Sequence, residues 1–310
     1  MPAPVVIDCD PGHDDAIALL LALASPELEL LGVTTVAGNQ SLEKTTANAI
    51  RVLELAGRGD VPVAAGSARP LVRELVVADW VHGESGMDGP VLRAPRAVPL
   101  DVQAVEFLAG VVEASTEPVT LIPTGPLTNV ALFLARYPEL AARLERIVAM
   151  GGAIAEGNVT PAAEFNVWAD PEAAARVFAS GLDVTMIGLD VTHRALMLPE
   201  HAGSLRAAGT PGAFVAELFD FFHRYHEATY GFRGSPIHDA VAVAHVAVPG
   251  LVTVAERHVA VECASELCRG RTVVDLWRRT GNPANAHVGV EIDAERFLEL
   301  LVVRLTSLSP

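Results

Sequence analysis

Lysine is almost missing from this chain of 310 residues: Lys44 is the only one, and arginine supplies the remaining positive charge. Lys and Arg together number 22 against 38 Asp and Glu, so the net charge is 22 − 38 = −16 at pH 7. Proteins that bind nucleic acid or dock on anionic membranes need a basic surface that pairs with phosphates. The charge balance therefore predicts a protein that binds neither nucleic acid nor a membrane.

Cysteine and long apolar runs are also scarce. The three cysteines, Cys9, Cys263 and Cys268, are too few and odd in number for a disulfide framework. No stretch reaches the roughly 18 uninterrupted apolar residues of a membrane span. Asp8 interrupts the apolar start of the chain, so we expect no signal peptide. These absences predict a soluble protein of a reducing, cytoplasmic compartment.

Apolar residues make up 51% of the chain and follow two alternating patterns over the first 190 positions. Short apolar runs bounded by turn residues predict buried parallel strands, at Pro4–Ile7, Leu28–Thr35, Val61–Ala65, Val119–Ile122, Arg146–Met150 and Leu182–Ile187. Stretches with helical spacing lie between them, at Asp14–Ala24, Leu42–Ala56, Val102–Ala114, Leu127–Ala135 and Pro171–Ala179. Strands that alternate with helices form βαβ units and a parallel sheet.

The chain becomes more helical beyond Pro199. Spacing predicts helices over Pro211–Tyr230, Ile237–Val246 and Glu295–Leu305, and alternation predicts an antiparallel hairpin region within His258–Ile292. No repeat or linker divides the sequence. We therefore predict an α/β fold in one domain over residues 1–310. It would have a mostly parallel, doubly wound sheet flanked by helices, plus a small C-terminal antiparallel hairpin region.

Residues 69–99 fit neither pattern. They contain Trp80, His82 and several glycines but few periodic apolar positions. A loop of this length in a compact domain is usually functional or mobile. The sequence therefore predicts that residues 69–99 form a mobile active-site loop.

The strongest chemical signal is an acidic motif after the first predicted strand, Asp8-Cys9-Asp10-Pro11-Gly12-His13-Asp14-Asp15. Ligands of open α/β sheets bind at the carboxyl ends of the strands. Four carboxylates at one such end repel each other unless a cation offsets their charge. Several hard oxygen ligands favour calcium or magnesium. A single acid could simply cap the following helix, but four within eight residues predict a metal site.

A second chemistry fits part of this motif. Asp8 and Asp10 after an apolar strand resemble the start of haloacid-dehalogenase-type phosphatases, in which the first Asp attacks phosphorus. That reaction also needs a lysine that clamps the phosphoryl charge, and Lys44 is the only candidate. A phosphatase is therefore the weaker alternative.

The segment Asp8–Asp15, continued by Ala16-Ile17-Ala18-Leu19, resembles the N-terminal signature of the inosine-uridine-preferring nucleoside hydrolase family. Four further stretches resemble that family in the same order: Thr35–Asn39, Pro123–Asn129, Met150-Gly151-Gly152 running on to Asn166, and His238-Asp239. The resemblance covers essentially the whole chain, and five ordered motifs are far more specific than one. It implies a calcium-dependent hydrolase that cuts ribonucleosides into ribose and free base, as in nucleoside catabolism and salvage.

The resemblance also assigns roles to residues. Calcium would be held by Asp10, Asp15, the backbone carbonyl of Thr124 and Asp239. Asp10 would also be the catalytic base that takes a proton from water, and His238 would be the catalytic group beside the leaving base. Ribose would contact Asp14, Asn39, Met150, Asn158, Glu164 and Asn166. His82 in the 69–99 loop matches a substrate-binding histidine of the family.

Several assignments stay open at this level. Tyr230 either binds the base, as the rival proton donor to His238, or is a half-buried amphipathic residue of its helix. Taken singly, Glu164 could be a solvated surface acid and Met150 a core residue. The pocket could also belong to a non-catalytic calcium-dependent nucleoside-binding protein, although the retained Asp10 favours an enzyme. Purine versus pyrimidine preference is undecided, and the resemblance implies a homodimer or homotetramer.

Overall fold

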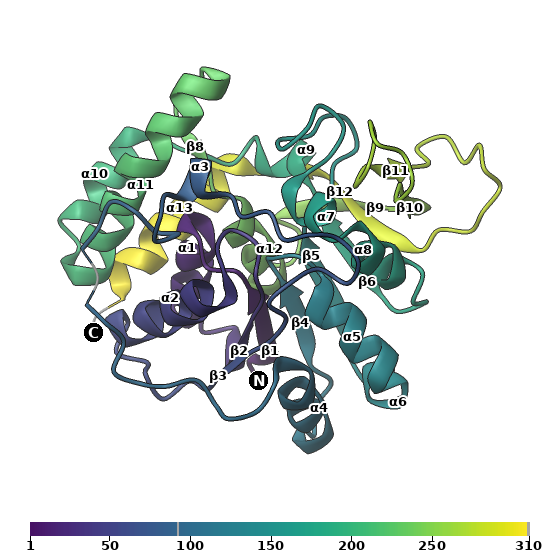
Figure 1. The fold of residues 1–310 in the computed structure, drawn as a ribbon. Helices are drawn as coiled ribbons and strands as arrows, with labels where there is room; N and C mark the ends of the chain where they lie inside the picture. Colours follow the sequence, from purple (N-terminus) through teal and green to yellow (C-terminus); the bar gives the residue numbers. More distant parts are fainter. Residues whose placement is uncertain (92, 309–310) are drawn as a thin grey trace.

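A computed structural model describes residues 1–91 and 93–308, and a sheet of eight strands runs through its centre (Figure 1). The strands lie in the order β3-β2-β1-β4-β5-β6-β12-β9. Their bounds are β1 Ala3–Cys9, β2 Leu28–Thr35, β3 Val63–Ala65, β4 Thr120–Pro123, β5 Arg146–Met150, β6 Val184–Ile187, β9 Val252–Arg257 and β12 Ala286–Ile292. Neighbouring strands are parallel except for β9 and β12 at one edge. The predicted α/β class with a mostly parallel sheet is confirmed.

Helices cover both faces of the sheet (Figure 1). One layer contains α1 His13–Leu23, α2 Leu42–Leu55, α10 Pro199–Arg206, α11 Gly209–Tyr230, α12 His238–Ala247 and α13 Ala294–Ser307. The opposite layer contains α4 Ala104–Ala114, α5 Thr128–Arg136, α6 Pro138–Ala141 and α8 Pro171–Phe178. The remaining helices are single short turns near the loops: α3 Asp79–His82, α7 Phe165–Ala169 and α9 Leu189–Thr192.

The central strand β1 contributes to both layers, because successive side chains of a strand point to opposite faces. Val5 and Ile7 pack in the core with α1, α2 and α12, whereas Val6 packs in the core with α4 and α5. All three side chains are fully buried, and each such side chain stabilises the fold by about 1.5–3 kcal/mol. A strand buried on both faces therefore needs the unbroken apolar run that begins this sequence.

The antiparallel region near the C-terminus is partly integrated into the main sheet. Strand β12 pairs with β9 in antiparallel and with β6 in parallel, so this pair extends the central sheet. A separate small sheet joins β10 Val259–Val261 to β11 Thr272–Val274, and another joins β7 Leu196–Met197 to β8 Ser235–Pro236. The predicted hairpin region is present, but one half of it closes the edge of the central sheet.

The order of the strands places a topological switch point beside β1. The chain runs from β1 outward through β2 to β3, returns to β4 on the other side of β1, and continues to β6. The connections leave the carboxyl ends of β1 and β4 in opposite directions, which opens a crevice between them. Asp10 follows β1 and Thr124 follows β4, so the motif residues meet at this crevice.

The segment 69–99 is irregular apart from the single turn of α3. Side chains from several elements hold this segment to the rest of the fold, among them His13 and Lys44. The Nε2 atom of His13 lies 2.8 Å from the carbonyl of Asp88, and Lys44 Nζ donates a hydrogen bond to the carbonyl of Glu84. The segment carries Trp80 and His82 to the carboxyl edge of the sheet, while its mobility stays a prediction.

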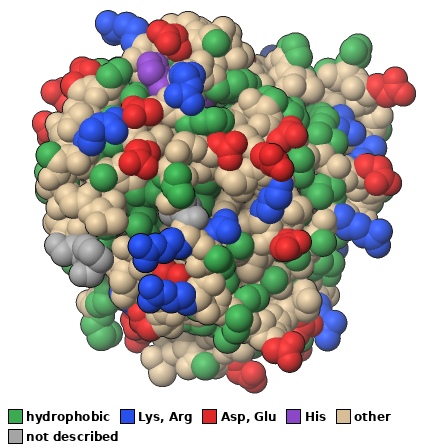
Figure 2. All heavy atoms as spheres, turned by 60° about the vertical axis from the view of Figure 1, so that its left-hand side comes forward, with side chains coloured by type: hydrophobic (Ala, Val, Ile, Leu, Met, Phe, Trp, Pro, Cys, Tyr) green, Lys and Arg blue, Asp and Glu red, His purple; other side chains and the backbone are tan. Residues whose placement is uncertain are grey.

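The face of the molecule that carries the left-hand helices of Figure 1 shows mixed charge. Acidic and basic side chains alternate in small groups over it, with scattered apolar side chains between them (Figure 2). Within residues 1–91 and 93–308, no helix has the length and apolar character needed to cross a membrane.

Candidate active site

A cavity that is partly open to solvent lies at the switch point. Eleven of the sequence-predicted site residues line it: Asp14, Asn39, His82, Thr124, Met150, Asn158, Glu164, Asn166, Tyr230, His238 and Asp239. The other two, Asp10 and Asp15, are fully buried directly behind Asn39. The backbone N–H of Asn39 donates to Asp10 Oδ2 at 2.6 Å, and its Nδ2 donates to Asp15 Oδ2 at 3.1 Å. The fold thus brings all predicted site residues to one place.

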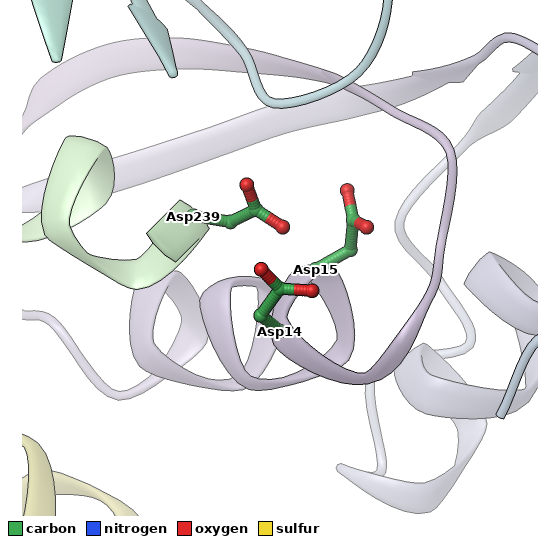
Figure 3. Close-up of side chains that lie close together, drawn as sticks. All are labelled: Asp14, Asp15 and Asp239. Carbon is green, nitrogen blue, oxygen red and sulfur yellow. The ribbon is translucent and has the colours of Figure 1, made fainter. Parts of the chain in front are cut away.

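Three carboxylates converge on the floor of this cavity. Asp14 and Asp15 on α1 and Asp239 on α12 point toward one another (Figure 3), each with an oxygen within 4.8 Å of the other two. Burial, followed by repulsion from Asp15, raises the pKa of Asp14 to about 8. Burial, followed by the charge of Asp14, raises the pKa of Asp239 well above its usual range. Only a cation would keep all three ionised near neutral pH.

Asp10 is the fourth buried acid of the site. Its Oδ1 atom has no hydrogen-bond partner within the part of the chain that the structure describes. Gly38 and Gly125 flank the carboxylate; a Cβ at Gly38 would collide with Oδ2, and one at Gly125 would lie 2.6 Å from Oδ1. Burial, then the charge of Asp15, raises the pKa of Asp10 well above its usual range. A buried oxygen without a donor is the environment of a metal ligand.

The grouping of the acids differs in one respect from the expected metal set. Asp15 and Asp239 meet as predicted, but the third member of the compact group is Asp14, which was expected to bind ribose, and not Asp10. Thr124 adjoins the group because its Oγ1 donates to Asp15 Oδ1 at 2.8 Å. Its carbonyl accepts from Asn166 Nδ2 at 2.6 Å. That carbonyl has a second lone pair, which leaves it able to bind a cation as well.

Glu164 lies on the side wall of the cavity. It is 3% exposed, so the alternative of a solvated surface acid is wrong. Its Oε1 accepts from the backbone N–H of Asn166 at 2.9 Å, and its Oε2 accepts from Gly152 at 2.9 Å and from Val167 at 3.1 Å. The side chain therefore caps α7 and fixes the turn that follows β5, while one face of it still borders the cavity.

Met150 and Asn158 complete the same wall. Met150 ends β5, packs in the core and also lines the cavity, while its contact with ribose stays a prediction. Its Sδ lies 3.7 Å from Asn166 Nδ2. Asn158 Oδ1 accepts from the backbone N–H of Phe165 at 2.9 Å, which orders the loop that carries it. These contacts hold the polar side chains in place before any ligand enters.

Another part of the lining is made of rings. His82 Nδ1 lies 3.0 Å from His13 Nδ1, His238 Nδ1 lies 2.7 Å from Thr192 Oγ1, and the Tyr230 hydroxyl donates to the Asn158 carbonyl at 3.3 Å. Burial lowers the pKa of both His82 and His238 well below the usual value, so both are neutral. A wall of neutral rings suits a flat heteroaromatic base.

Several lining residues were not assigned from the sequence. Trp80, Phe165, His193 and Phe222 all border the cavity. Trp80 and Phe165 sit next to assigned motif residues, so adjacency in the sequence could have identified them. His193 and Phe222 lie outside every motif, and only the packing of α9 and α11 against the cavity reveals them.

The phosphatase alternative fails on geometry. Asp8, which would be the nucleophile, is fully buried away from the cavity wall, and its Oδ1 accepts from Thr34 Oγ1 and from Asn129 Nδ2. Lys44 donates to the carbonyl of Glu84 and does not border the cavity. Neither group can therefore reach a phosphoryl substrate.

Comparison with known proteins agrees with this geometry. Residues 5–299 match the protein family described as inosine-uridine preferring nucleoside hydrolase. The chain belongs to this family. It is accordingly a ribonucleoside hydrolase, an enzyme and not a non-catalytic nucleoside-binding protein.

Relatives within the nucleoside hydrolase family span the whole chain. A "Pyrimidine-specific ribonucleoside hydrolase RihA" of Shewanella sp. (strain ANA-3) is 54% identical over 100% of this chain and 98% of its own length. The protein of the same description from Escherichia coli O9:H4 (strain HS) is 52% identical over 98% and 99%. Among solved structures, a "Purine-Preferring Ribonucleoside Hydrolase from Gardnerella vaginalis" has a TM-score of 0.93 at 34% identity, covering 98% of each chain. A plant nucleoside hydrolase, PpNRh1, has the same TM-score and identity over 99% of this chain and 100% of its own.

Proposed function

We propose that the protein hydrolyses the N-glycosidic bond of pyrimidine ribonucleosides with calcium as its cofactor, giving ribose and the free base. The main support is the buried group of Asp14, Asp15 and Asp239 at the cavity. Asp10, whose Oδ1 has no hydrogen-bond partner among the described residues, adds a fourth buried acid to the site. The pyrimidine preference rests on the curated relatives, which are named pyrimidine-specific at 52–54% identity. The purine-preferring structural relative is more distant, at 34%.

The donor set fits calcium. Asp10, Asp15 and Asp239 with the carbonyl of Thr124 would hold the ion, and all of these donors are oxygens. Calcium accepts 6–8 oxygen ligands in flexible geometry, so ribose hydroxyls and water can fill the remaining positions. When bound, the ion would supply a lowered pKa for the attacking water and would offset the charge of the buried carboxylates.

Asp10 is the residue that we assign as the general base. The N–H of Asn39 fixes Oδ2 at 2.6 Å, which leaves Oδ1 as the oxygen free to take a proton. Oxygen of the attacking water forms a bond to C1′ of the ribose while the bond from C1′ to the base breaks. The ribose carbon develops positive charge in this step, as in other glycoside hydrolyses. The neighbouring carboxylate of Asp14 stabilises that charge.

Different parts of the cavity lining would contact the ribose and the base of the substrate. We assign Asp14, Asn39, Asn158, Glu164 and Asn166 to the ribose hydroxyls, with Met150 against the sugar ring. His82, His238 and Tyr230 face the base. Since burial keeps His238 neutral, its contribution is a hydrogen bond from an uncharged imidazole that stabilises charge on the departing base.

The experiment is an assay of ribose release from uridine, cytidine, inosine and adenosine. Release should be fastest from uridine or cytidine. Removal of divalent ions by a chelator should abolish it, and added calcium should restore it. Full turnover in a metal-free sample would contradict the role of the acids, and a preference for inosine would contradict the pyrimidine assignment.

We further propose that the protein acts as a homodimer or homotetramer in the cytoplasm. Two surface segments support self-association, since Val72, Val91 and Val98 in one, and Leu267 and Trp277 in the other, expose most of their apolar surface. All three cysteines are free, which is compatible with a reducing compartment. The molar mass measured by light scattering after size-exclusion chromatography tests this oligomeric state, and a monomeric mass would contradict it.

A further inference from the structure

Four histidines border the cavity, and their partners differ. His82 faces His13, His226 Nδ1 faces the carbonyl of Phe222 at 3.0 Å, and His238 faces a threonine hydroxyl. His193 is the one with a carboxylate partner among the described residues: its Nδ1 lies 3.4 Å from Glu156 Oε1. A carboxylate favours the protonated form of an imidazole, so His193 is the cavity histidine best suited to carry a proton.

The fold holds this pair in a defined place. Glu156 lies on the loop after β5, and Asp190 fixes that loop by accepting the backbone N–H of Ile154 and of Ala155 at 3.1 Å. His193 follows the end of α9, directly after the Thr192 that contacts His238. Helix α9 therefore positions both members of the pair, His193 directly and Glu156 through the contacts of Asp190 with its loop, and the pair does not depend on a ligand.

The Nε2 atom of His193 is available to contact a ligand in the cavity. Glu156 engages Nδ1, and Nε2 has no hydrogen-bond partner among residues 1–91 and 93–308, on a ring that lines the cavity. The ring centroid lies 5.5 Å from that of His238 and 6.2 Å from that of Tyr230, the two residues assigned to the base. The side chain is 13% exposed, so solvent can return a proton to it after turnover.

Titratable groups surround His193 on several elements. Burial lowers the pKa of His193 below its usual value, and the opposing effect of Glu156 and Asp190 offsets only part of that shift. His226 and Tyr230 face the ring from α11, and His238 faces it from α12. By contrast, burial lowers the pKa of His226 to about 4, with no carboxylate to oppose it. The Glu156 side chain is 73% exposed, so solvent partly screens its charge.

We propose that His193, paired with Glu156, is the general acid that protonates the departing base; this inference rests on the proposed function. As the bond between C1′ and the base breaks, its electron pair moves to the base, and the proton on His193 Nε2 moves to a ring nitrogen or carbonyl oxygen of the base. The water oxygen bonds to C1′ and its proton goes to Asp10. Neutral His193 then regains a proton from solvent, and Asp10 releases its own, so that the cycle is balanced.

The test compares two leaving groups in two variants. Uridine needs an acid, whereas p-nitrophenyl riboside releases a stable anion without one. His193→Gln keeps a polar group of similar length but cannot carry a proton. It should lower kcat/KM for uridine by about 10²-fold or more and that for the nitrophenyl riboside by no more than about twofold. Glu156→Gln should move the alkaline limb of the uridine pH profile downward by about half a pH unit.

A matched pair outside the cavity provides the control. His287 Nε2 lies 3.5 Å from Asp183 Oδ1 at the amino ends of β12 and β6, away from the cavity at the carboxyl ends of the strands. His287→Gln and Asp183→Asn should therefore match the wild type on both substrates. Equal losses on both substrates in His193→Gln, no loss on uridine, or an unmoved limb in Glu156→Gln would overturn the acid role. Failure of the wild-type protein to release ribose from any pyrimidine ribonucleoside would instead overturn the proposed function itself.

Discussion

At the scale of single residues, the site depends on polar groups whose geometry is set before a ligand binds. Asp10 illustrates this, because Asn39 occupies one carboxylate oxygen and two glycines leave no space for the group to turn away. Asn166 is fixed in the same manner by the carbonyls of Thr124 and Met150. Fixed polar groups lose little entropy when substrate binds and favour the geometry of the transition state.

Asp10→Asn tests the assignment of the base. An amide fits the same space, but it cannot accept a proton from water, so kcat should fall by about 10²–10⁴-fold while substrate binding persists. Steady-state rates on uridine and a separate titration of ribonucleoside binding measure the two effects. The matched control is Asp60→Asn at an exposed surface pair, which should change neither. Near wild-type turnover in Asp10→Asn would require another base.

The ribose contacts predict strong discrimination at the sugar. The cavity presents Asp14, Asn39 and Asn166 as buried polar groups in its lining, and these would be left unpaired by a sugar without its hydroxyl. A site built for a hydroxyl rejects such an analogue by about 10⁴-fold or more. The measurement is kcat/KM for 2′-deoxyuridine against uridine, which share one base. Equal rates would remove these residues from ribose binding.

At the scale of elements, the loop of residues 69–99 depends on the helix α1 that follows the acidic motif. The His13 ring is fully buried, stacks on Phe221 and Phe222 with centroids 5.2 Å apart, and lies 2.8 Å from the Asp88 carbonyl through Nε2. A carbonyl only accepts, so Nε2 carries the hydrogen. One histidine of the motif thereby positions both the loop and His82.

His13→Phe should loosen this loop and leave the rest of the fold intact. Phenylalanine keeps the stacking but leaves the carbonyl of Asp88 without its donor, at a cost of about 1 kcal/mol. Hydrogen exchange over residues 79–88 should accelerate, and KM should rise. Lys44→Met, which removes an exposed bond to Glu84 in the same loop, should change stability by less than about 0.5 kcal/mol. Similar exchange in the two variants would contradict the role of His13.

At the scale of the whole molecule, the buried acids make stability depend on pH and on the cation. Burial raises the pKa of Asp8 to about 6, and burial with repulsion from Asp15 raises that of Asp14 to about 8. The metal-free folded state therefore binds protons more tightly than the unfolded state, in which these groups titrate near pH 4. The contribution of these groups to stability is greatest below that pH and falls as the pH rises through their folded pKa values.

Thermal unfolding of metal-free protein should reveal this dependence. Each unit of raised pKa corresponds to about 1.4 kcal/mol, so Tm should drop by about 2 °C or more between pH 5 and pH 8. Calcium should restore most of that loss, because a bound cation stabilises the ionised form of the acids. The gap in Tm between loaded and metal-free protein should thus widen with pH. A constant gap would contradict a cation site made of these groups.

The sequence by itself determined the fold class and the order of the main strands and helices. Unbroken apolar runs such as Val5-Val6-Ile7 can only be strands buried on both faces, and their alternation with helices requires a parallel sheet. The predicted helix over Pro211–Tyr230 differs from α11 by two residues at its start. The acidic motif after the first strand marked the carboxyl edge, because a strand end and a following helix fix its place in any such fold.

The tertiary structure alone decided which side chains meet and in what state. Asp14 joins Asp15 and Asp239 because α12 packs against α1, a contact between segments more than two hundred positions apart. Glu164 is buried because three backbone N–H groups surround it. His193 and Glu156 belong to no motif that the sequence revealed, and their pairing depends on how α9 and the loop after β5 pack in the fold. Local spacing carries no information on such distances, since burial and partnership arise only when separate elements pack together.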